Sequence, residues 1–152
     1  MTLTPGMSSV RDLLIKLQRD ADLLEDEVTN DRFFNFVITG YSMIDWVKHD
    51  PSVPIGAKTH IAIQGLRSDR WLTVCGDLAT ASKHFKLTHR VPVVASTDSS
   101  RGYNLGRYGK GGYGIGEASI DVELNDGTKF GCLDLVRGVL STWSSFFAIH
   151  SI

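Results

Sequence analysis

Cysteine and proline are scarce in this chain, and long apolar runs are missing. Its 152 residues include only two cysteines, Cys75 and Cys132, and four prolines. Two cysteines so far apart are not the framework of a disulfide-rich secreted domain, so we expect free thiols in a reducing compartment. No segment is expected to be a membrane-spanning helix, which needs a long stretch of apolar residues, and the first residues lack the basic-then-apolar pattern of a signal peptide. We therefore expect a cytoplasmic protein that has no membrane partner.

The chain also lacks an excess of either charge. Its formal net charge of -1 excludes the strongly basic composition of a dedicated nucleic-acid binder. The charges are nevertheless unevenly placed, because acids gather early and cations gather in the middle, where Asp98 is the only acid between Lys83 and Lys110. Either block can be a solvated face, but this asymmetry allows an anionic ligand near the middle. The central cations are Lys83, Lys86, Arg90, Arg101, Arg107 and Lys110.

The segment 30–50 is apolar at most positions and predicts a central helix that is buried on most sides. Four polar residues, spaced four, three and three apart, form one stripe along it: Asn35, Thr39, Ser42 and Asp45. One interpretation is that this stripe faces solvent or is paired with neighbouring backbone in the core. The other is that it forms the wall of a polar pocket, in which Asp45 supplies the only formal charge.

The remaining pattern predicts a single α+β domain spanning residues 1–152. We expect a mainly α fold, an approximately four-helix bundle, with a small antiparallel two- or three-stranded sheet inserted before the C-terminal helix. Helices are expected at 10–28, 30–50, 70–85 and 135–149, the last capped by Asp134; strands at 91–94, 118–124 and 129–132; and loops at 50–56 and 96–100. Segment 60–66 is ambiguous between a helical turn and an extended segment. The small residues Gly76, Ala79 and Ala81 allow the central helix to approach closely.

The last helix has an outer face of serine and threonine, and no formal charge follows Arg137 unless His150 is protonated. A helix that faces solvent usually carries charges, so this face can contact a second copy in a homodimer or another protein partner. Alternatively, the helix packs within its own domain.

Segment 101–117 is a glycine-rich loop. Residues 109–114 match G-x-G-x-x-G literally, but a strand follows instead of the helix that a dinucleotide site requires. Rings and cations alternate along the loop, so it could stack on bases and contact phosphates of a nucleic acid or another anionic ligand. The alternative is a flexible hairpin connection. The candidate ligand-binding residues are Lys86, His89, Arg90, Arg101, Tyr103, Arg107, Tyr108, Lys110 and Tyr113.

A second candidate site is an acid/base cluster of Asp45, Asp77, Lys83 and His84, in which a carboxylate could orient the imidazole. The structural alternative is a salt bridge from Asp45 to Lys83 or His84 that joins two core helices. His84 and His89 are five residues apart, which is not the spacing that puts two imidazoles on one helix face. We therefore expect no metal site and no cofactor.

The segments FFNFVITGYSMIDWVKHD and CGDLATASKHF resemble small uncharacterised bacterial helical proteins and are similar to the HEPN-like domains. The resemblance implies a four-helix unit of the kind found in toxin–antitoxin and phage-defence systems. HEPN ribonucleases carry an arginine followed four to six residues later by a histidine. No arginine here has a histidine at that distance, so the resemblance implies a non-catalytic member.

Three functions follow from these patterns. The first is a non-catalytic binding module that takes an anionic partner through the basic loop. The second is a metal-independent nuclease centred on His84, Lys83, Asp77 and Asp45. The third is an inhibitory or structural protein that binds another protein through its last helix.

Overall fold

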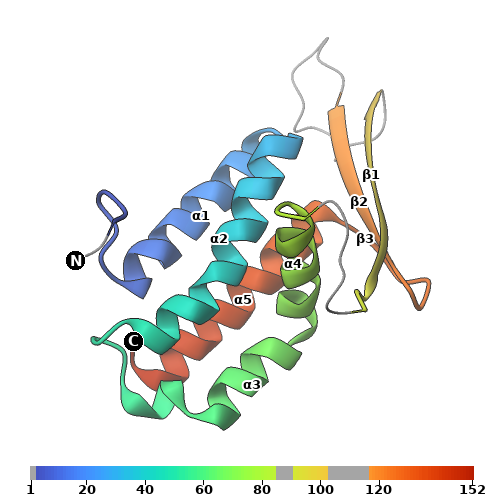
Figure 1. Ribbon diagram of the computed structural model, residues 1–152. Coiled ribbons are helices and arrows are strands. Elements are labelled where there is room, and N and C mark those ends of the chain that lie inside the picture. Colours follow the sequence, from blue (N-terminus) through green and yellow to red (C-terminus); the bar gives the residue numbers. More distant parts are fainter. Residues whose placement is uncertain (1–2, 85–90, 103–116) are drawn as a thin grey trace.

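The computed structural model describes residues 3–84, 91–102 and 117–152 (Figure 1). Its element order is α1 (Val10–Asp26), α2 (Asn30–His49), the 3-10 helix η1 (Ile55–Lys58), α3 (His60–Ser68), α4 (Arg70–Ala81), β1 (Val94–Gly102), β2 (Glu117–Leu124), β3 (Lys129–Gly131) and α5 (Cys132–His150). The α+β prediction is confirmed, because most of the described chain is helical and a three-stranded antiparallel sheet precedes the last helix.

Besides Thr59, whose hydroxyl accepts a hydrogen bond from the Ala62 amide at the start of α3, side-chain caps fix where three further helices begin. Ser9 and Asp12 form a capping box at α1, Thr29 accepts a hydrogen bond from the Arg32 amide at α2, and Asp69 caps α4. These starts were predicted. The predicted Asp134 cap is wrong, because α5 begins at Cys132 with Gly131 as its N-cap and no side-chain cap. Asp134 lies in the first turn, where a carboxylate favours the helix dipole.

Helix α2 is the central element, as predicted. It packs against α1 and α4 and also contacts α3 and α5. Its core face consists of Phe33, Phe36, Val37, Thr39, Gly40, Met43, Ile44 and Val47, all buried. Only a narrow strip that includes Phe34, Asn35 and Asp45 is exposed.

The polar stripe of α2 is satisfied by backbone and by α1. Buried Thr39 donates to the carbonyl of Asn35 at 2.9 Å and receives a hydrogen bond from Lys16 Nζ at 2.8 Å. Lys16 also pairs with Asp20 on α1, and Ser42 Oγ donates to the Ile38 carbonyl at 2.7 Å. These contacts favour the interpretation of a stripe paired with its neighbours over that of a pocket wall.

Helices α2 and α4 approach closely at small residues, as the sequence predicts. A Cβ added to Gly76 would lie 2.6 Å from Cε2 of Tyr41. Beside it, the Cys75 thiol donates to the Val37 carbonyl at 3.1 Å. The two helices run in opposite directions in Figure 1, and this direction decides which of their other residues can meet.

The sheet has the order β1-β2-β3, and its buried face consists of Ile120, Val122 and Leu124 on β2. The expectation of a loop at 96–100 is wrong, because these residues belong to β1 and pair with β2. Their serines and aspartate disfavour strands, so only pairing with a neighbouring strand reveals the element. Segment 60–66 lies in α3, which resolves that ambiguity in favour of the helix.

Helix α5 combines a core face with an outer polar face. Trp143 is fully buried, and its indole Nε1 donates to the Gly40 carbonyl at 3.0 Å. In the described part of the chain, α5 is the one helix long and apolar enough, by length and composition, to cross a membrane. The core helix of a soluble protein passes the same test, so this finding does not overturn the expectation that the chain has no membrane-spanning run. Its buried face packs on α1, α2 and α4, while Ser141, Ser144 and Ser145 are exposed.

Candidate functional site

The predicted acid/base cluster is not assembled. Asp45 has a side chain that is 74% exposed, and its carboxylate lies 3.4 Å from Nδ1 of His49 on its own helix. The expected salt bridge from Asp45 to Lys83 or His84 is therefore wrong.

The direction of the helices explains this error. Because α2 and α4 are antiparallel and Tyr41 faces Gly76, Asp45 and Lys83 lie on opposite sides of that contact. At a rise of 1.5 Å per residue, they are roughly 16 Å apart along the helix axes. Helix α4 also ends at Ala81, so Lys83 and His84 are exposed residues beyond its end.

Asp77 joins the helices to the sheet. Its carboxylate is buried, with 2% of the residue exposed, and Oδ2 accepts hydrogen bonds from the amides of Val93 at 2.6 Å and Val94 at 3.2 Å. Asn125 reinforces the same junction, because its side chain donates to the Pro92 carbonyl at 2.6 Å. The geometry thus gives Asp77 a structural role at the start of β1.

The predicted ligand-binding residues fall mostly outside the described ranges. Among them only Arg101 is described, as a residue of β1 paired with Ala118. Lys86, His89, Arg90, Tyr103, Arg107, Tyr108, Lys110 and Tyr113 lie in 85–90 and 103–116, outside the described residues. What the fold does establish is the position of the loop's two ends, because Gly102 pairs with Glu117.

The body of the β1–β2 hairpin carries charge of the opposite sign to its connecting loop. Asp98 is directly opposite Asp121 in the register, and both are exposed. Glu123 follows on the same face of β2 and pairs with Lys129 of β3 at 3.2 Å. An acidic outer face of the strands therefore adjoins a loop segment, 103–116, that contains cations and no acids.

The cysteines are packing residues. Burial raises the pKa of the Cys75 thiol far above its usual range, and it raises the pKa of Cys132 to about 11. Neither thiol is poised as a nucleophile at neutral pH. Within the described residues, no group of three or more His, Cys, Asp or Glu side chains could hold a metal ion.

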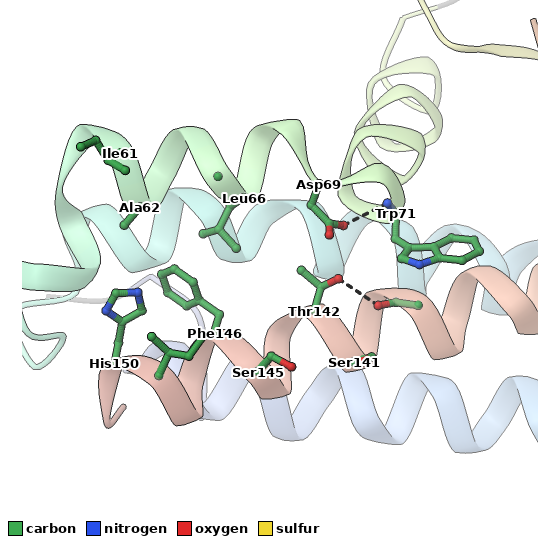
Figure 2. A pocket seen from close by; sticks show the side chains of 13 residues that line it. Ile61, Ala62, Leu66, Asp69, Trp71, Ser141, Thr142, Ser145, Phe146 and His150 are labelled. Atoms are coloured by element: carbon green, nitrogen blue, oxygen red, sulfur yellow. Dashed lines mark hydrogen bonds between the residues drawn. The ribbon is translucent and has the colours of Figure 1, made fainter.

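A groove of about 490 Å³ lies between α3 and α5, and sequence reasoning did not anticipate it (Figure 2). Its lining combines apolar side chains with hydroxyls: Ile61, Ala62, Gly65, Leu66, Asp69, Trp71, Gly138, Ser141, Thr142, Ser145, Phe146, Ile149 and His150. The one signal in the sequence was the uncharged serine face of α5. Its counterpart on α3 lies about eighty residues away in the chain and could not be paired with it from the sequence.

Comparison of the chain with protein-family models, with curated proteins and with solved structures finds no match. The HEPN-like resemblance of the helices therefore stays a prediction.

Proposed function

We propose that this protein is a non-catalytic binding module that takes single-stranded nucleic acid on its basic glycine-rich loop, predicted at 101–117, whose ends Arg101, Gly102 and Glu117 belong to β1 and β2. The observation that carries the proposal is the pairing of Gly102 with Glu117. Because the strands pair up to these residues, the loop connects the two paired strand ends of a hairpin.

The composition of the loop supports a nucleic-acid ligand. Three cations, Arg101, Arg107 and Lys110, are interleaved with Tyr103, Tyr108 and Tyr113, and the first acid after Asp98 is Glu117. Cations attract the phosphates, whereas the tyrosine rings offer stacking surfaces that every base can use. Glycines between them let the chain follow a flexible strand.

The catalytic alternative loses its geometric support. The carboxylate of Asp45 lies beside the His49 ring on its own helix, and the buried carboxylate of Asp77 accepts a hydrogen bond from the Val93 amide next to β1. Lys83 and His84 lie beyond the end of α4. A nuclease needs its acid, base and charge-stabilising groups in one place.

The test is fluorescence anisotropy with labelled single-stranded oligonucleotides of RNA and DNA, repeated at rising salt. Three phosphate contacts on a single strand predict a slope of log K against log salt of about -2. The double variant Arg107→Ala/Lys110→Ala is expected to reduce the slope to about one third. Arg11→Ala/Arg19→Ala, which removes two exposed cations of α1, is the matched control and is expected to leave the slope unchanged.

Tyrosine variants separate base stacking from general attraction to polyanions. Tyr108→Ala is expected to weaken binding by about 1–3 kcal/mol, while Tyr108→Phe retains the ring and the affinity. Absent binding at low salt would refute the proposal. Equal affinity for heparin, with no effect of the tyrosine variants, would replace the nucleic-acid partner by an unspecific polyanion.

A further inference from the structure

One face of the three-stranded sheet is acidic and turned away from the helices. Along β2, the buried residues Ile120, Val122 and Leu124 alternate with polar ones, so the polar side chains lie on the opposite face. Residues directly opposite in an antiparallel pair share a face, so β1 adds its own polar residues to it. We call this surface the acidic face, and it consists of Ser96, Asp98, Ser100, Ser119, Asp121 and Glu123.

The charge of the acidic face is only partly neutralised. Glu123 pairs with Lys129 of β3 at 3.2 Å. Asp121 lies between Asp98 on β1 and Gly131 on β3, so neither neighbouring strand places a cation opposite it. Within the described residues, neither Asp98 nor Asp121 forms an ion pair. Because like charges directly opposite each other destabilise a sheet, this pair does not serve the stability of the fold.

The distance of these carboxylates from the end of the hairpin decides which phosphates they can repel. Asp98 lies four residues before Gly102, and Asp121 lies four residues after Glu117. At a rise of about 3.3 Å per residue, both are roughly 13 Å from the strand ends. The Debye length at physiological salt is about 8 Å. The two carboxylates therefore act weakly on phosphates beyond the strand ends and strongly on phosphates that pass along the acidic face.

A nucleic-acid strand that continued from the loop along the hairpin would meet this repulsion. Figure 1 shows the sheet on one side of the helices, and β2 packs on α5 with its apolar face. The side of the hairpin that meets solvent is the acidic face. The free edge of the sheet gives no neutral path either, because β1 is the edge strand and carries Asp98 itself.

We propose that the acidic face limits how much nucleic acid the protein binds, with Asp98 and Asp121 as the residues that determine this specificity. The pair repels phosphates from the sheet, so the ligand is a short single-stranded segment that turns away from the protein at the strand ends. This inference rests on the proposed binding of nucleic acid to the loop, and it specifies the length of strand that the loop accepts.

The test compares fluorescein-labelled oligothymidylates of about five and about twenty nucleotides by fluorescence anisotropy. The Kd of Asp98→Lys is divided by that of the unmodified protein at each length, which cancels the larger number of binding positions on the longer strand. At about 0.15 M salt, the substitution is expected to leave the short strand unchanged. It is expected to tighten the long strand about fivefold, since two unit charges change at an exposed surface.

Two further variants separate a local effect from net charge and from folding. Asp45→Lys changes the net charge by the same amount at a side chain of α2 that is 74% exposed, and it is expected to change neither affinity. Asp98→Asn/Asp121→Asn removes both carboxylates without adding a cation, and it is expected to tighten only the long strand, by about twofold. Thermal unfolding of each variant shows whether the fold is retained.

Two measurements report where the long strand lies. With ¹⁵N-labelled Asp98→Lys, the long strand is expected to shift the amide signals of Ser96 and Glu123, which are paired on the acidic face. In the unmodified protein these two signals are expected to stay in place. The slope of log K against log salt is expected to steepen by about 0.7 in Asp98→Lys, for the long strand only, because one phosphate contact is added.

Three results would overturn this inference and leave the proposed function standing. The first is binding of both strands, sensitive to Arg107→Ala/Lys110→Ala, that no substitution of Asp98 or Asp121 changes. The second is an equal effect of Asp98→Lys and Asp45→Lys, since net charge would then explain it. The third is a shift of the Ser96 and Glu123 signals when the long strand binds the unmodified protein. Absent binding of both strands at low salt would overturn the inference together with the proposed function.

Discussion

The indole ring of Trp71 on α4 lies so close to Gly138 on α5 that a Cβ at position 138 would overlap the ring. The glycine therefore lets an aromatic side chain lie directly on the backbone of the neighbouring helix. This contact joins α4 to α5 and also forms part of the floor of the α3–α5 groove.

Gly138→Ala is expected to destabilise the protein by about 1–3 kcal/mol, because the indole ring must move out of a packed position. Gly65→Ala is the matched control: it lies in α3 with nothing within 4 Å of the added Cβ, so it is expected to stabilise by about 0.5–1 kcal/mol through helix propensity. Urea unfolding measures both. Equal effects of the two substitutions would show that the ring does not depend on the glycine.

The carboxylate of Asp50 is expected to make stability depend on acid pH. Asp50 is 7% exposed and accepts hydrogen bonds from the Val10 amide at 2.7 Å and from the Ser52 amide and hydroxyl at 2.8 and 2.6 Å. Burial raises the pKa of Asp50, but these hydrogen bonds and the charge of Lys58 outweigh it, so the pKa falls below its ordinary 3.8. Folding thus favours the charged form.

This stabilisation is complete above the ordinary pKa and is lost as the pH falls through the lowered pKa of the folded state. Asp50→Asn is expected to lower the free energy of unfolding at pH 7 by about 1–3 kcal/mol, and the difference from the unmodified protein should shrink toward pH 2. Asp45→Asn, at an exposed position of α2, is the control and should change it by less than about 0.5 kcal/mol. A difference for Asp50→Asn that does not vary with pH would contradict the assignment.

The cross-strand pair of Asp98 and Asp121 places like charges directly opposite each other. Asp98→Lys is expected to stabilise the hairpin by about 0.2–1 kcal/mol by replacing repulsion with attraction. The gain should diminish at high salt, because both positions are exposed. Thermal unfolding at low and at high salt measures it, and a destabilised variant at low salt would show that the two carboxylates do not interact.

The two thiols are expected to react slowly in the folded protein. Because burial raises the pKa of Cys132 to about 11, only about one thiol in a thousand is ionised at pH 8, and Cys75 is more deeply buried. A disulfide reagent such as Ellman's reagent should modify both thiols within the mixing time in urea and far more slowly without it. Rapid modification of one thiol in the folded state would show that its segment opens locally.

The sequence by itself determined α1, α2, α4 and α5 and their inner faces, because the spacing of apolar residues and the caps at Ser9, Thr29 and Asp69 act within a few residues. Tertiary structure alone decided what depends on distant pairing. The strand at 96–100 exists through its partner β2. Asp45 is separated from Lys83 because two helices run in opposite directions, and the groove requires α3 and α5, which are far apart in the chain. Local patterns specify which face of an element is apolar, whereas the direction and partner of that face follow from how all the elements pack together.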